Sequence, residues 1–491
     1  KRATQFFSIS PSNGFNAEKY KALLEGLEIS EVAFSAVASN KDERSDSDFW
    51  TKQPKKNSKL YYEKIGDCLI QSQYGISIEM NENANGYPIY RMNEIHNMLC
   101  DFEVDKHADI SQSEMEIFRL NDRDVLFNRT NSYEWVGRTG IYRKVDQRDF
   151  IFASYLVKFV PDQSKLLPEY LAAFLNSSYG IWDVKRRSRQ SINQTNVNPE
   201  EVKQIEIPLL GLGFQEKIKR NFDSAYEFLK TSENLYKQAE IALLDAVGLA
   251  DFKPSTQNTN VKNFAQSFGE TGRLDAEYYQ TKYEDYLKLI IGYKNGWCKL
   301  TNVCELKDSN FSPDDYVEYQ YIELSNINKS GGVSGCTSDI GKNLPSRARR
   351  LVSAGDVVIS SIEGSLLSCA LVTSEYDNAL CSTGFYVIKS DEINSETLLV
   401  MMKSALMQNI LKQNCSGTIL TAINKDEFSN LPIPKIDLTT QTNISELVQQ
   451  SFTLKIEGER LLNVAKHAVE IAIQQDEFAG LAYIKMEAPR N

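Results

Sequence analysis

Residues 44–50 read Arg-Ser-Asp-Ser-Asp-Phe-Trp, and residues 273–279 read Arg-Leu-Asp-Ala-Glu-Tyr-Tyr, 229 positions later. Four further blocks recur in the same order at offsets between 226 and 232: 91–95 with 323–327, 124–127 with 356–359, 205–208 with 431–434, and Gln215 and Ile218 with Gln441 and Ile444. Each block is weak alone, but five blocks in one order indicate a module of about 230 residues that occurs twice. Because the side chains between the blocks differ widely, the two copies are expected to share a fold but not a surface.

Each copy is predicted to mix short strands with helices. Apolar and β-branched runs bounded by turn residues predict strands at 117–120, 125–127, 140–142 and 150–159, and again at 351–352, 357–359, 370–372 and 384–388. Helical spacing of apolar residues predicts helices over 168–176, 275–291 and 395–413.

Two much longer helices follow the copies. Residues 214–247 contain no Pro and no Gly, and their apolar residues recur at steps of three and four, as in a coiled-coil seam. Residues 441–475 repeat the pattern with one expected break near Gly458. At 1.5 Å per residue each helix is about 50 Å long, too long to bury its seam against one small domain. The two helices are therefore expected to pair antiparallel. Separate bundle helices are the alternative.

The expected fold class is α+β. It has two similar mixed α/β domains joined by two long antiparallel coiled-coil helices, as a pseudo-twofold internal repeat. The expected boundaries are 1–213 for the first domain, with an N-terminal extension of about 1–30, then 214–250 for the first long helix, 251–437 for the second domain, and 438–491 for the second long helix and C-terminal tail.

Composition is that of an ordinary globular chain. Of 491 residues, 42% are hydrophobic and 25% charged, which suits two or three domains. No apolar run approaches the length that crosses a bilayer, and no secretory signal is visible. The first residue is Lys1 rather than Met, which indicates a chain trimmed or cut from a longer polypeptide.

The eight cysteines form no CxxC pair, and three histidines accompany them. Reduced cysteines in a cytoplasmic protein are therefore expected, with no zinc site and no disulfide scaffold. The net charge of −11 argues against a general nucleic-acid coat. It leaves room for sequence-specific DNA binding, which needs local positive potential.

Four ordered segments of the first copy carry a family resemblance: 74–77 (Tyr-Gly-Ile-Ser), 87–95, 124–132 and 136–140. With residues 189–197 leading into the Ile-Pro strand, and the opening at 273–279, the chain resembles the specificity (S) subunits of type I restriction-modification systems over about residues 30–475. The second copy matches this family more loosely at 360–364. Residues 15–27 fit the family poorly, and they are expected to be either the tail of a fused methyltransferase or a local addition.

The resemblance implies two target-recognition domains that bind an asymmetric, bipartite double-stranded DNA site, with a spacer set by the helix pair. It implies docking of two copies of a modification (methyltransferase) subunit and of restriction/translocase subunits. S-adenosylmethionine, ATP and Mg would be bound by those partners. No cofactor is expected in this chain.

Catalytic motifs are absent from the sequence. It has no Pro-Pro pair for a base-holding methyltransferase loop, no Gly-rich loop after a plausible strand, and no Walker lysine motif. Residues 313–315 with Glu318 are expected to form a solvated loop rather than a nuclease site. We therefore expect a non-enzymatic subunit, although the assembled complex would be an adenine-N6 DNA methyltransferase and ATP-dependent endonuclease.

Polar loops after strands supply the DNA-facing candidates, since base edges are read by bidentate donors and amides, and phosphates by cations. No metal or catalytic residue is assigned. In the first copy the DNA-facing candidates are Tyr74, Arg91, Asn93, Asn128, Arg129, Thr130, Asn131, Arg138, Lys185, Arg186, Arg187, Arg189, Gln190 and Asn193. In the second copy they are Ser325, Asn326, Arg347, Arg349, Arg350, Ser361, Glu363, Ser416, Thr418 and Lys425. The alternative reading is that these loops cap turns and that the arginine clusters are solvated faces.

Two other functions remain open at this point. The chain can be the specificity region of a fused type IIG/IIB restriction-methyltransferase. It can also be an interaction scaffold in phage defence that does not read DNA, which its acidic balance slightly favours.

Overall fold

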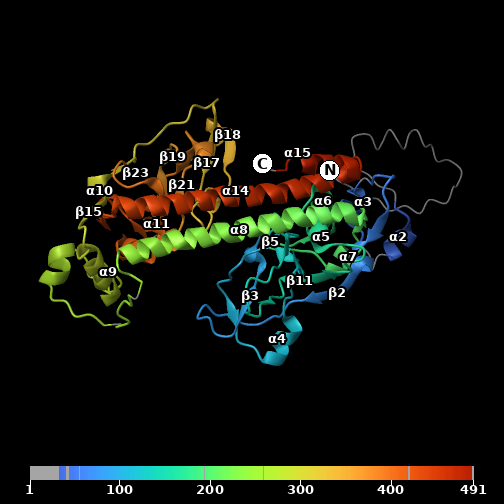
Figure 1. The fold of residues 1–491 in the computed structure, drawn as a ribbon, viewed down its shortest axis with the longest axis horizontal. Coiled ribbons are helices and arrows are strands. Elements are labelled where there is room, and N and C mark those ends of the chain that lie inside the picture. Colours follow the sequence, from blue (N-terminus) through green and yellow to red (C-terminus); the bar gives the residue numbers. More distant parts are fainter. Residues whose placement is uncertain are drawn as a thin grey trace. The chain divides into compact units, whose positions relative to one another are not determined.

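The computed structural model describes residues 32–39, 44–52, 54, 56–192, 194–250, 252–257, 259–417 and 421–488. The chain divides into two compact units, and each long helix contributes one part to each unit. Unit 1 comprises residues 1–228 and 457–491, and unit 2 comprises residues 229–456. Figure 1 shows their helices and strands, many of them labelled.

The elements of unit 1 that precede the first long helix are α2 (Phe34–Ser39), α3 (Ser47–Thr51), β1 (Tyr62–Lys64), η1 (Ile65–Cys68), β2 (Leu69–Tyr74), β3 (Tyr87–Tyr90), η2 (Met92–Glu94), β4 (Ile95–His96), β5 (Leu99–Cys100), β6 (His107–Ala108), α4 (Gln112–Phe118), β7 (Val125–Asn128), β8 (Thr130–Asn131), β9 (Thr139–Ile141), β10 (Ile151–Phe152), β11 (Leu156–Pro161), α5 (Pro168–Leu175), α6 (Ser178–Arg187), β12 (Arg189–Gln190), β13 (Thr195–Asn196), α7 (Pro199–Lys203) and β14 (Glu206–Pro208).

The elements between the long helices, all in unit 2, are η3 (Ala265–Gly269), α9 (Thr281–Ile291), β15 (Trp297–Lys299), α10 (Leu300–Val303), β16 (Cys304–Leu306), β17 (Glu318–Ile322), η4 (Leu324–Asn326), β18 (Thr337–Ile340), η5 (Gly341–Asn343), β19 (Ala348–Leu351), β20 (Val357–Ser360), η6 (Glu363–Ser365), β21 (Cys369–Leu371), η7 (Ser374–Tyr376), β22 (Leu380–Ser382), β23 (Phe385–Ser390), α11 (Ser395–Lys403), α12 (Ala405–Gln413), β24 (Cys415–Ser416), β25 (Ala422–Ile423), α13 (Lys425–Ser429) and β26 (Pro432–Pro434).

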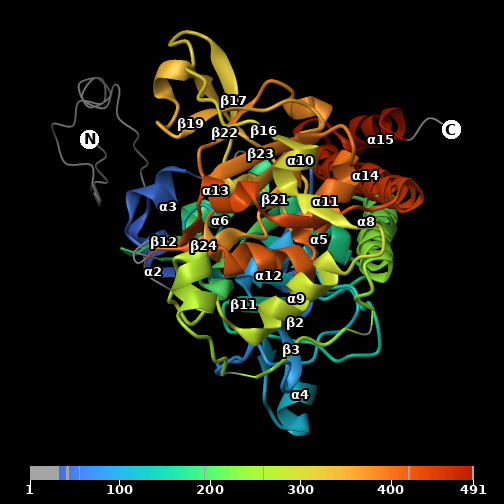
Figure 2. The same cartoon turned by 90° about the vertical axis from the view of Figure 1, so that its left-hand side faces the viewer.

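The two units share one strand topology, which confirms the internal repeat and the α+β class. The order β2-β11-β7-β9 in unit 1 corresponds to β16-β23-β20-β21 in unit 2. The parallel pair β10–β3 corresponds to β22–β17, and Figure 2 shows β17, β22 and β19 lying side by side. The first strand pairs antiparallel with the Ile-Pro strand in both units, as β1–β14 and β15–β26.

The first repeated block forms the same clamp in both units. The Arg44 side chain pairs with Asp46, lies 4.6 Å from the Phe49 ring centroid, and donates to the backbone oxygen of Arg187. Its counterpart Arg273 pairs with Asp275, lies 4.4 Å from the Tyr278 ring centroid, and donates to the backbone oxygen of Cys415. The repeated Arg-x-Asp motif therefore ties each domain opening to the segment that precedes β12 or begins β24.

The long helices α8 (Leu212–Ala246) and α14 (Leu438–Gln474) run antiparallel, as predicted. The start of α8 and the end of α14 lie in unit 1, and the opposite ends lie in unit 2. Within unit 2 the hydroxyls of Ser232 and Ser451 are 3.0 Å apart in the buried seam. The interruption of the apolar pattern near Gly458 does not break the helix, since α14 is continuous. The chain ends with α15 (Glu477–Met486), whose Glu477 carboxylate accepts from the Gly211 amide before α8.

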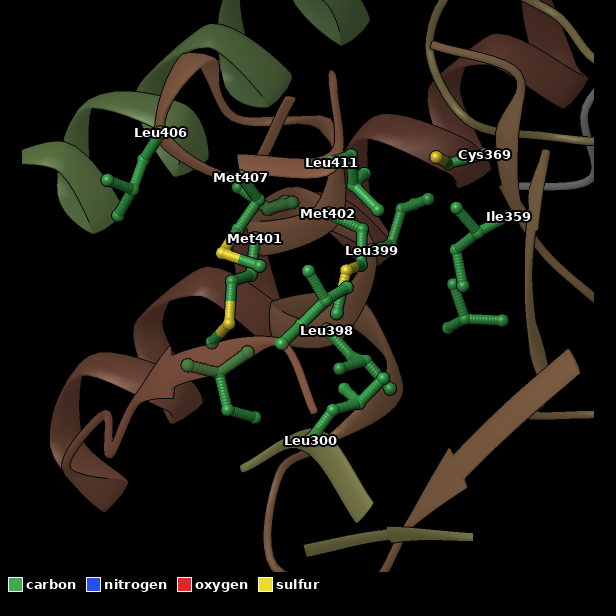
Figure 3. Packing of buried hydrophobic residues seen from close by; sticks show 14 of the residues in the cluster. Leu300, Ile359, Cys369, Leu398, Leu399, Met401, Met402, Leu406, Met407 and Leu411 are labelled. Atoms are coloured by element: carbon green, nitrogen blue, oxygen red, sulfur yellow. The ribbon is translucent and has the colours of Figure 1, made fainter. Parts of the chain in front are cut away.

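Each unit has its own core. In unit 1, buried aromatic side chains such as Tyr90, Tyr142 and Phe150 pack with Leu126 of β7. The larger core of unit 2 is built on α11 and α12, and Figure 3 shows their Leu and Met side chains gathered near Leu300, Ile359 and Cys369.

Some predicted elements differ from the structure. Residues 117–120 were expected to form a strand, but Ile117 lies in helix α4, because Ser111 and Glu114 form a capping box. The expected strand 150–159 is two strands in different sheets, β10 and β11. The expected helix 275–291 begins only at Thr281.

The single helix expected over 395–413 is two helices in the structure, α11 and α12. The Ser404 side chain accepts a hydrogen bond from the Met407 amide and so caps the second helix. The strand expected at 351–352 begins earlier and ends at Leu351.

Candidate nucleic-acid interface

A three-stranded sheet brings the two predicted polar loops of unit 1 together. Strand β13 pairs with β8 on one side and β12 on the other, so that Thr195 lies opposite Asn131 and Gln190. Sequence separation hid this arrangement, because the loops around 129–131 and 189–196 are about sixty residues apart. We call this sheet and the loop that follows β8 the β8–β13–β12 site.

Arg129 and Tyr74 meet at the edge of this site. The Arg129 guanidinium carbon lies 5.3 Å from the Tyr74 ring centroid, within cation–π range. Tyr74 keeps 46% of its surface exposed. Arg129 also donates to the backbone oxygen of Ser154 at 3.5 Å. Arg129 is thus partly buried on one side, while the Tyr74 ring remains accessible.

Asn128 and Thr130, which were expected to read bases, are buried and form hydrogen bonds within the site. The Asn128 Oδ1 accepts from the Thr130 amide at 3.2 Å, and Asn128 is fully buried. The Thr130 hydroxyl donates to Asn196 Oδ1 at 2.7 Å, which ties β8 to β13. Alternation along a strand places one residue inside and the next outside, so Arg129 and Asn131 are the partly exposed members of this segment.

The loop from Ser132 to Arg138, which we call the aromatic loop, carries two exposed rings that the sequence reading omitted. Tyr133 is 47% exposed and Trp135 is 42% exposed. The Arg138 guanidinium carbon lies 3.5 Å from the Trp135 ring centroid, so the two side chains stack. The signal available in the sequence was a pair of aromatic residues in a turn-rich segment flanked by Arg129 and Arg138.

Lys185 on α6 ties down the aromatic loop. Its ammonium donates to the backbone oxygens of Tyr133, Glu134 (3.1 Å) and Val136 (3.0 Å). Burial lowers the pKa of Lys185 from 10.5 to about 8, and the Arg138 guanidinium acts in the same direction while the Glu134 carboxylate opposes it. Lys185 therefore orders the loop as well as adding charge to it.

Arg186 and Arg187, which were expected to contact phosphates, are both buried at 7% exposure. They pair with Asp183 at 2.7 and 3.0 Å, since positions three and four apart share a helix face. Arg187 also pairs with Glu201 at 2.8 Å. Both guanidinium groups lie within 5.6 Å of the Phe49 ring centroid. The basic run is mainly a structural anchor, and of its members Arg189 is the exposed one.

The remaining candidates of unit 1 have mixed placements. Arg91 pairs with Glu94 at 2.5 Å in η2, whereas Asn93 is exposed. Gln190 is exposed on β12. Asn193 lies outside the described residues.

Unit 2 repeats the architecture of the β8–β13–β12 site with different chemistry. Ile362 bridges to Ala422 of β25, and β25 pairs with β24. Where unit 1 has Arg129, unit 2 has Ser361, whose hydroxyl donates to the backbone oxygen of Gly384 at 2.9 Å. Glu363 is 3.9 Å from the Lys412 ammonium. This region combines an acid with a lysine and carries no stacked arginine–tryptophan pair among its described residues.

The arginine cluster of unit 2 lies at an edge strand. Strand β19 is the outer strand of the order β18-β17-β22-β19. Arg347, just before it, is exposed, while Arg349 and Arg350 are half-buried. The Arg350 Nη1 atom is buried and has no hydrogen-bond partner in the described part of the chain.

The other described candidates of unit 2 are wholly or partly exposed. Ser325 and Ser416 are exposed, and the Asn326 side chain accepts from the Glu323 amide in η4. Lys425 pairs with Asp308, which lowers the pKa of that carboxyl. Thr418 lies outside the described residues.

Within the described ranges, no three His, Cys, Asp or Glu side chains gather as metal ligands. None of the described helices is both long and apolar enough to span a membrane. Burial raises the pKa of the Cys369 thiol to about 12. That shift makes this thiol a poor nucleophile.

Comparison with curated proteins confirms the recognised resemblance. No model of a known protein family matches the chain. Over 233 residues, 47% of this chain, it is 26% identical to a putative type I restriction enzyme MjaX specificity subunit of Methanocaldococcus jannaschii. Over 182 residues, 37% of this chain, it is 25% identical to the type I restriction enzyme EcoKI specificity subunit of Escherichia coli. The matched regions span 53% and 38% of these relatives.

A solved structure of a type I restriction-modification S subunit from M. genitalium aligns with 89% of this chain and all of that chain. The sequence identity is 11% and the TM-score is 0.37.

Proposed function

We propose that the protein is a non-catalytic DNA-recognition subunit of a type I-like restriction-modification complex. Each unit would bind one half of a bipartite double-stranded DNA site, and the site would be asymmetric. One observation carries the proposal: the same topology occurs twice, with unlike side chains at the corresponding loops. In unit 1 these side chains include Arg129 and Arg138, whereas unit 2 has Ser361 and Glu363.

A protein that reads two different half-sites needs two different binding surfaces on the same scaffold. Base edges are distinguished by the donors, acceptors and apolar groups that face them, while the scaffold fixes their orientation. Two copies with equal surfaces would read a symmetric site. The two curated relatives reported above, a type I specificity subunit and a putative one, support the same assignment.

In this proposal the chain supplies recognition, and partner subunits supply chemistry. Two copies of a modification subunit would bring S-adenosylmethionine and methylate adenine, and restriction/translocase subunits would use ATP and Mg. The chain's own residues bind and orient the duplex.

The test selects binding sequences for the purified full chain, with and without modification subunits, from a pool of random duplexes. The expected result is two unlike half-sites at a fixed spacing. Arg129→Ala should lower affinity about ten- to a hundredfold and relax selectivity in one half-site alone, as the loss of a base or phosphate contact does. Arg148→Ala is the matched control, since Arg148 is an exposed arginine of unit 1 paired with Glu103 and Asp146.

Other outcomes point to other functions. No enrichment of any sequence, with or without partners, would leave the interaction scaffold as the better reading. A half-site that survives Arg129→Ala unchanged would remove the β8–β13–β12 site from the interface. A continuous gene reading into a methyltransferase before Lys1 would favour the fused type IIG/IIB enzyme.

A further inference from the structure

The aromatic loop of unit 1 presents large rings to solvent on a fixed backbone. Within the loop, the amides of Trp135 and Val136 donate to the Ser132 oxygen at 3.1 and 2.9 Å, and the Gly137 amide donates to the Asn128 oxygen at 2.8 Å. The three Lys185 contacts add to these bonds. The exposure of Tyr133 and Trp135 is therefore built into an ordered loop.

Close packing against α6 adds to this order. Gly137 has a φ of +92°, and a Cβ atom there would lie 2.6 Å from Val184 Cγ1. Glycine is required on both counts, since other residues rarely adopt that φ and no space exists for a side chain. The loop backbone thus touches the helix that carries Lys185, and the rings on the loop face outward.

Charge around the rings is positive although the chain as a whole is acidic. Arg129, Arg138 and Lys185 are at the site together with the Glu134 carboxylate, and exposed Arg189 lies on the neighbouring strand β12. The whole chain has a net charge of −11. An anionic partner with flat apolar groups fits this combination, and a nucleic acid has both, in its phosphates and its bases.

We propose that the aromatic loop stacks Trp135 on a DNA base that has left the helical stack, so that unit 1 recognises a locally opened duplex. This inference rests on the proposed function and adds a contact mode to it. Apolar and aromatic side chains that enter between base steps unstack the duplex, and the surrounding cations hold the phosphates of the distorted strand. The Arg138–Trp135 stack already holds the ring in place for this contact.

Unit 2 has a related loop without the rings. The Lys403 ammonium donates to the backbone oxygen of Leu367 at 3.1 Å, so a lysine again anchors the loop between two core strands. The side chain exposed at this position is Leu367, which is 62% exposed. Base stacking is therefore expected in the unit 1 half-site and not in the other half-site.

The experiment uses the full chain and a duplex with the selected site, in which 2-aminopurine replaces one base at a time. With the wild-type chain, 2-aminopurine emission should change at one position of the unit 1 half-site, because that base leaves the stack. Trp135→Ala should abolish this change and weaken binding about five- to a hundredfold, the range of a lost base–aromatic stack. Trp135→Phe, which keeps an aromatic face, should retain most of the affinity and the 2-aminopurine signal.

Tryptophan emission supplies a second readout from the protein side. Binding should quench the wild-type emission, and Trp135→Phe should lose that quenching while it still binds. Trp182→Ala is the control for an exposed tryptophan elsewhere in unit 1. It should leave both the quenching and the affinity unchanged. A melting temperature close to that of the wild type establishes that each variant is folded.

The results separate this inference from the proposed function. If the wild-type chain selects a bipartite site but Trp135→Ala binds it equally well, or if no 2-aminopurine position responds, base stacking is wrong and DNA recognition stands. If the wild-type chain selects no sequence, both are wrong. A response in both half-sites would also overturn the inference, because unit 2 lacks the aromatic loop.

Discussion

Two buried glutamines at the starts of the long helices should contribute equally to the stability of their units. The Gln215 side chain accepts from the Leu167 amide at 2.8 Å and donates to the backbone oxygens of Lys165 (3.0 Å) and Leu210 (2.8 Å). Gln215 is fully buried. These three bonds fix the turn before α5 to the turn before α8.

Gln441 repeats this arrangement in unit 2. It accepts from the Asn394 amide at 2.9 Å and donates to the backbone oxygens of Glu392 (3.2 Å) and Ile436 (2.9 Å). The Asn394 side chain adds a bond of 2.9 Å to the Gln441 backbone oxygen. The side chains of Gln215 and Gln441 thus make the same three kinds of contact, and the same substitution should have the same effect in each.

Gln215→Ala leaves one amide and two carbonyls without these partners in a buried junction. Each lost bond to a buried group costs about 1 kcal/mol or more, so the expected loss is about 3 kcal/mol of unfolding free energy. For a unit of this size the melting temperature should fall by about 6–12 °C. Gln441→Ala should cost the same within about 1 kcal/mol, and the two losses should add because the sites lie in different units.

Urea unfolding and amide hydrogen exchange measure these effects. The Leu167 amide should lose protection in Gln215→Ala, and the Asn394 amide in Gln441→Ala. Gln449→Ala, an exposed glutamine on α14, is the control and should cost less than about 0.5 kcal/mol. Gln215→Glu should be at least as damaging as Gln215→Ala, because a carboxylate would face two carbonyl oxygens. A loss below about 1 kcal/mol at either junction, or a stable Gln215→Glu, would refute the reasoning.

Two further predictions concern α6. Arg187→Met should destabilise the protein by about 3–5 kcal/mol, because Glu201 is left buried without its partner. In urea unfolding, the double variant Arg187→Met with Glu201→Leu should recover most of that loss. If Arg187→Met keeps full stability but loses DNA affinity, Arg187 is a phosphate contact instead. DNA affinity should fall by up to tenfold per pH unit as pH rises through about 8, because the Lys185 ammonium beside Glu134 and Arg138 loses its proton. In binding titrations, Lys185→Arg should flatten this pH dependence. The contribution of Lys185 to the unfolding free energy should instead rise between pH 8 and 10.5. The folded-state pKa of Lys185 is lowered, so the unfolded chain binds more protons than the folded chain in this range. Affinity and stability falling together would contradict that account.

For much of the site, the sequence predicted which segments take part but not how they are arranged. The segments 128–132 and 189–196 were both expected at the interface, and the structure joins them through β13. The members that face outward could not be predicted. Asn128 and Thr130 turn inward to hold β8, while the rings of Tyr133 and Trp135 were passed over because no spacing rule singles out an exposed aromatic residue in a loop.

The sequence alone determined the doubling of the module and the two long helices. Both rest on local patterns, since recurring blocks encode recurring turns and clamps, and apolar steps of three and four give a helix with one buried stripe. The tertiary structure alone decided the fate of the basic run on α6. Arg186 and Arg187 are buried because Asp183 shares their helix face and because Phe49 and Glu201, distant in the chain, close over them. Charge placement depends on such long-range partners, and a linear pattern does not contain them.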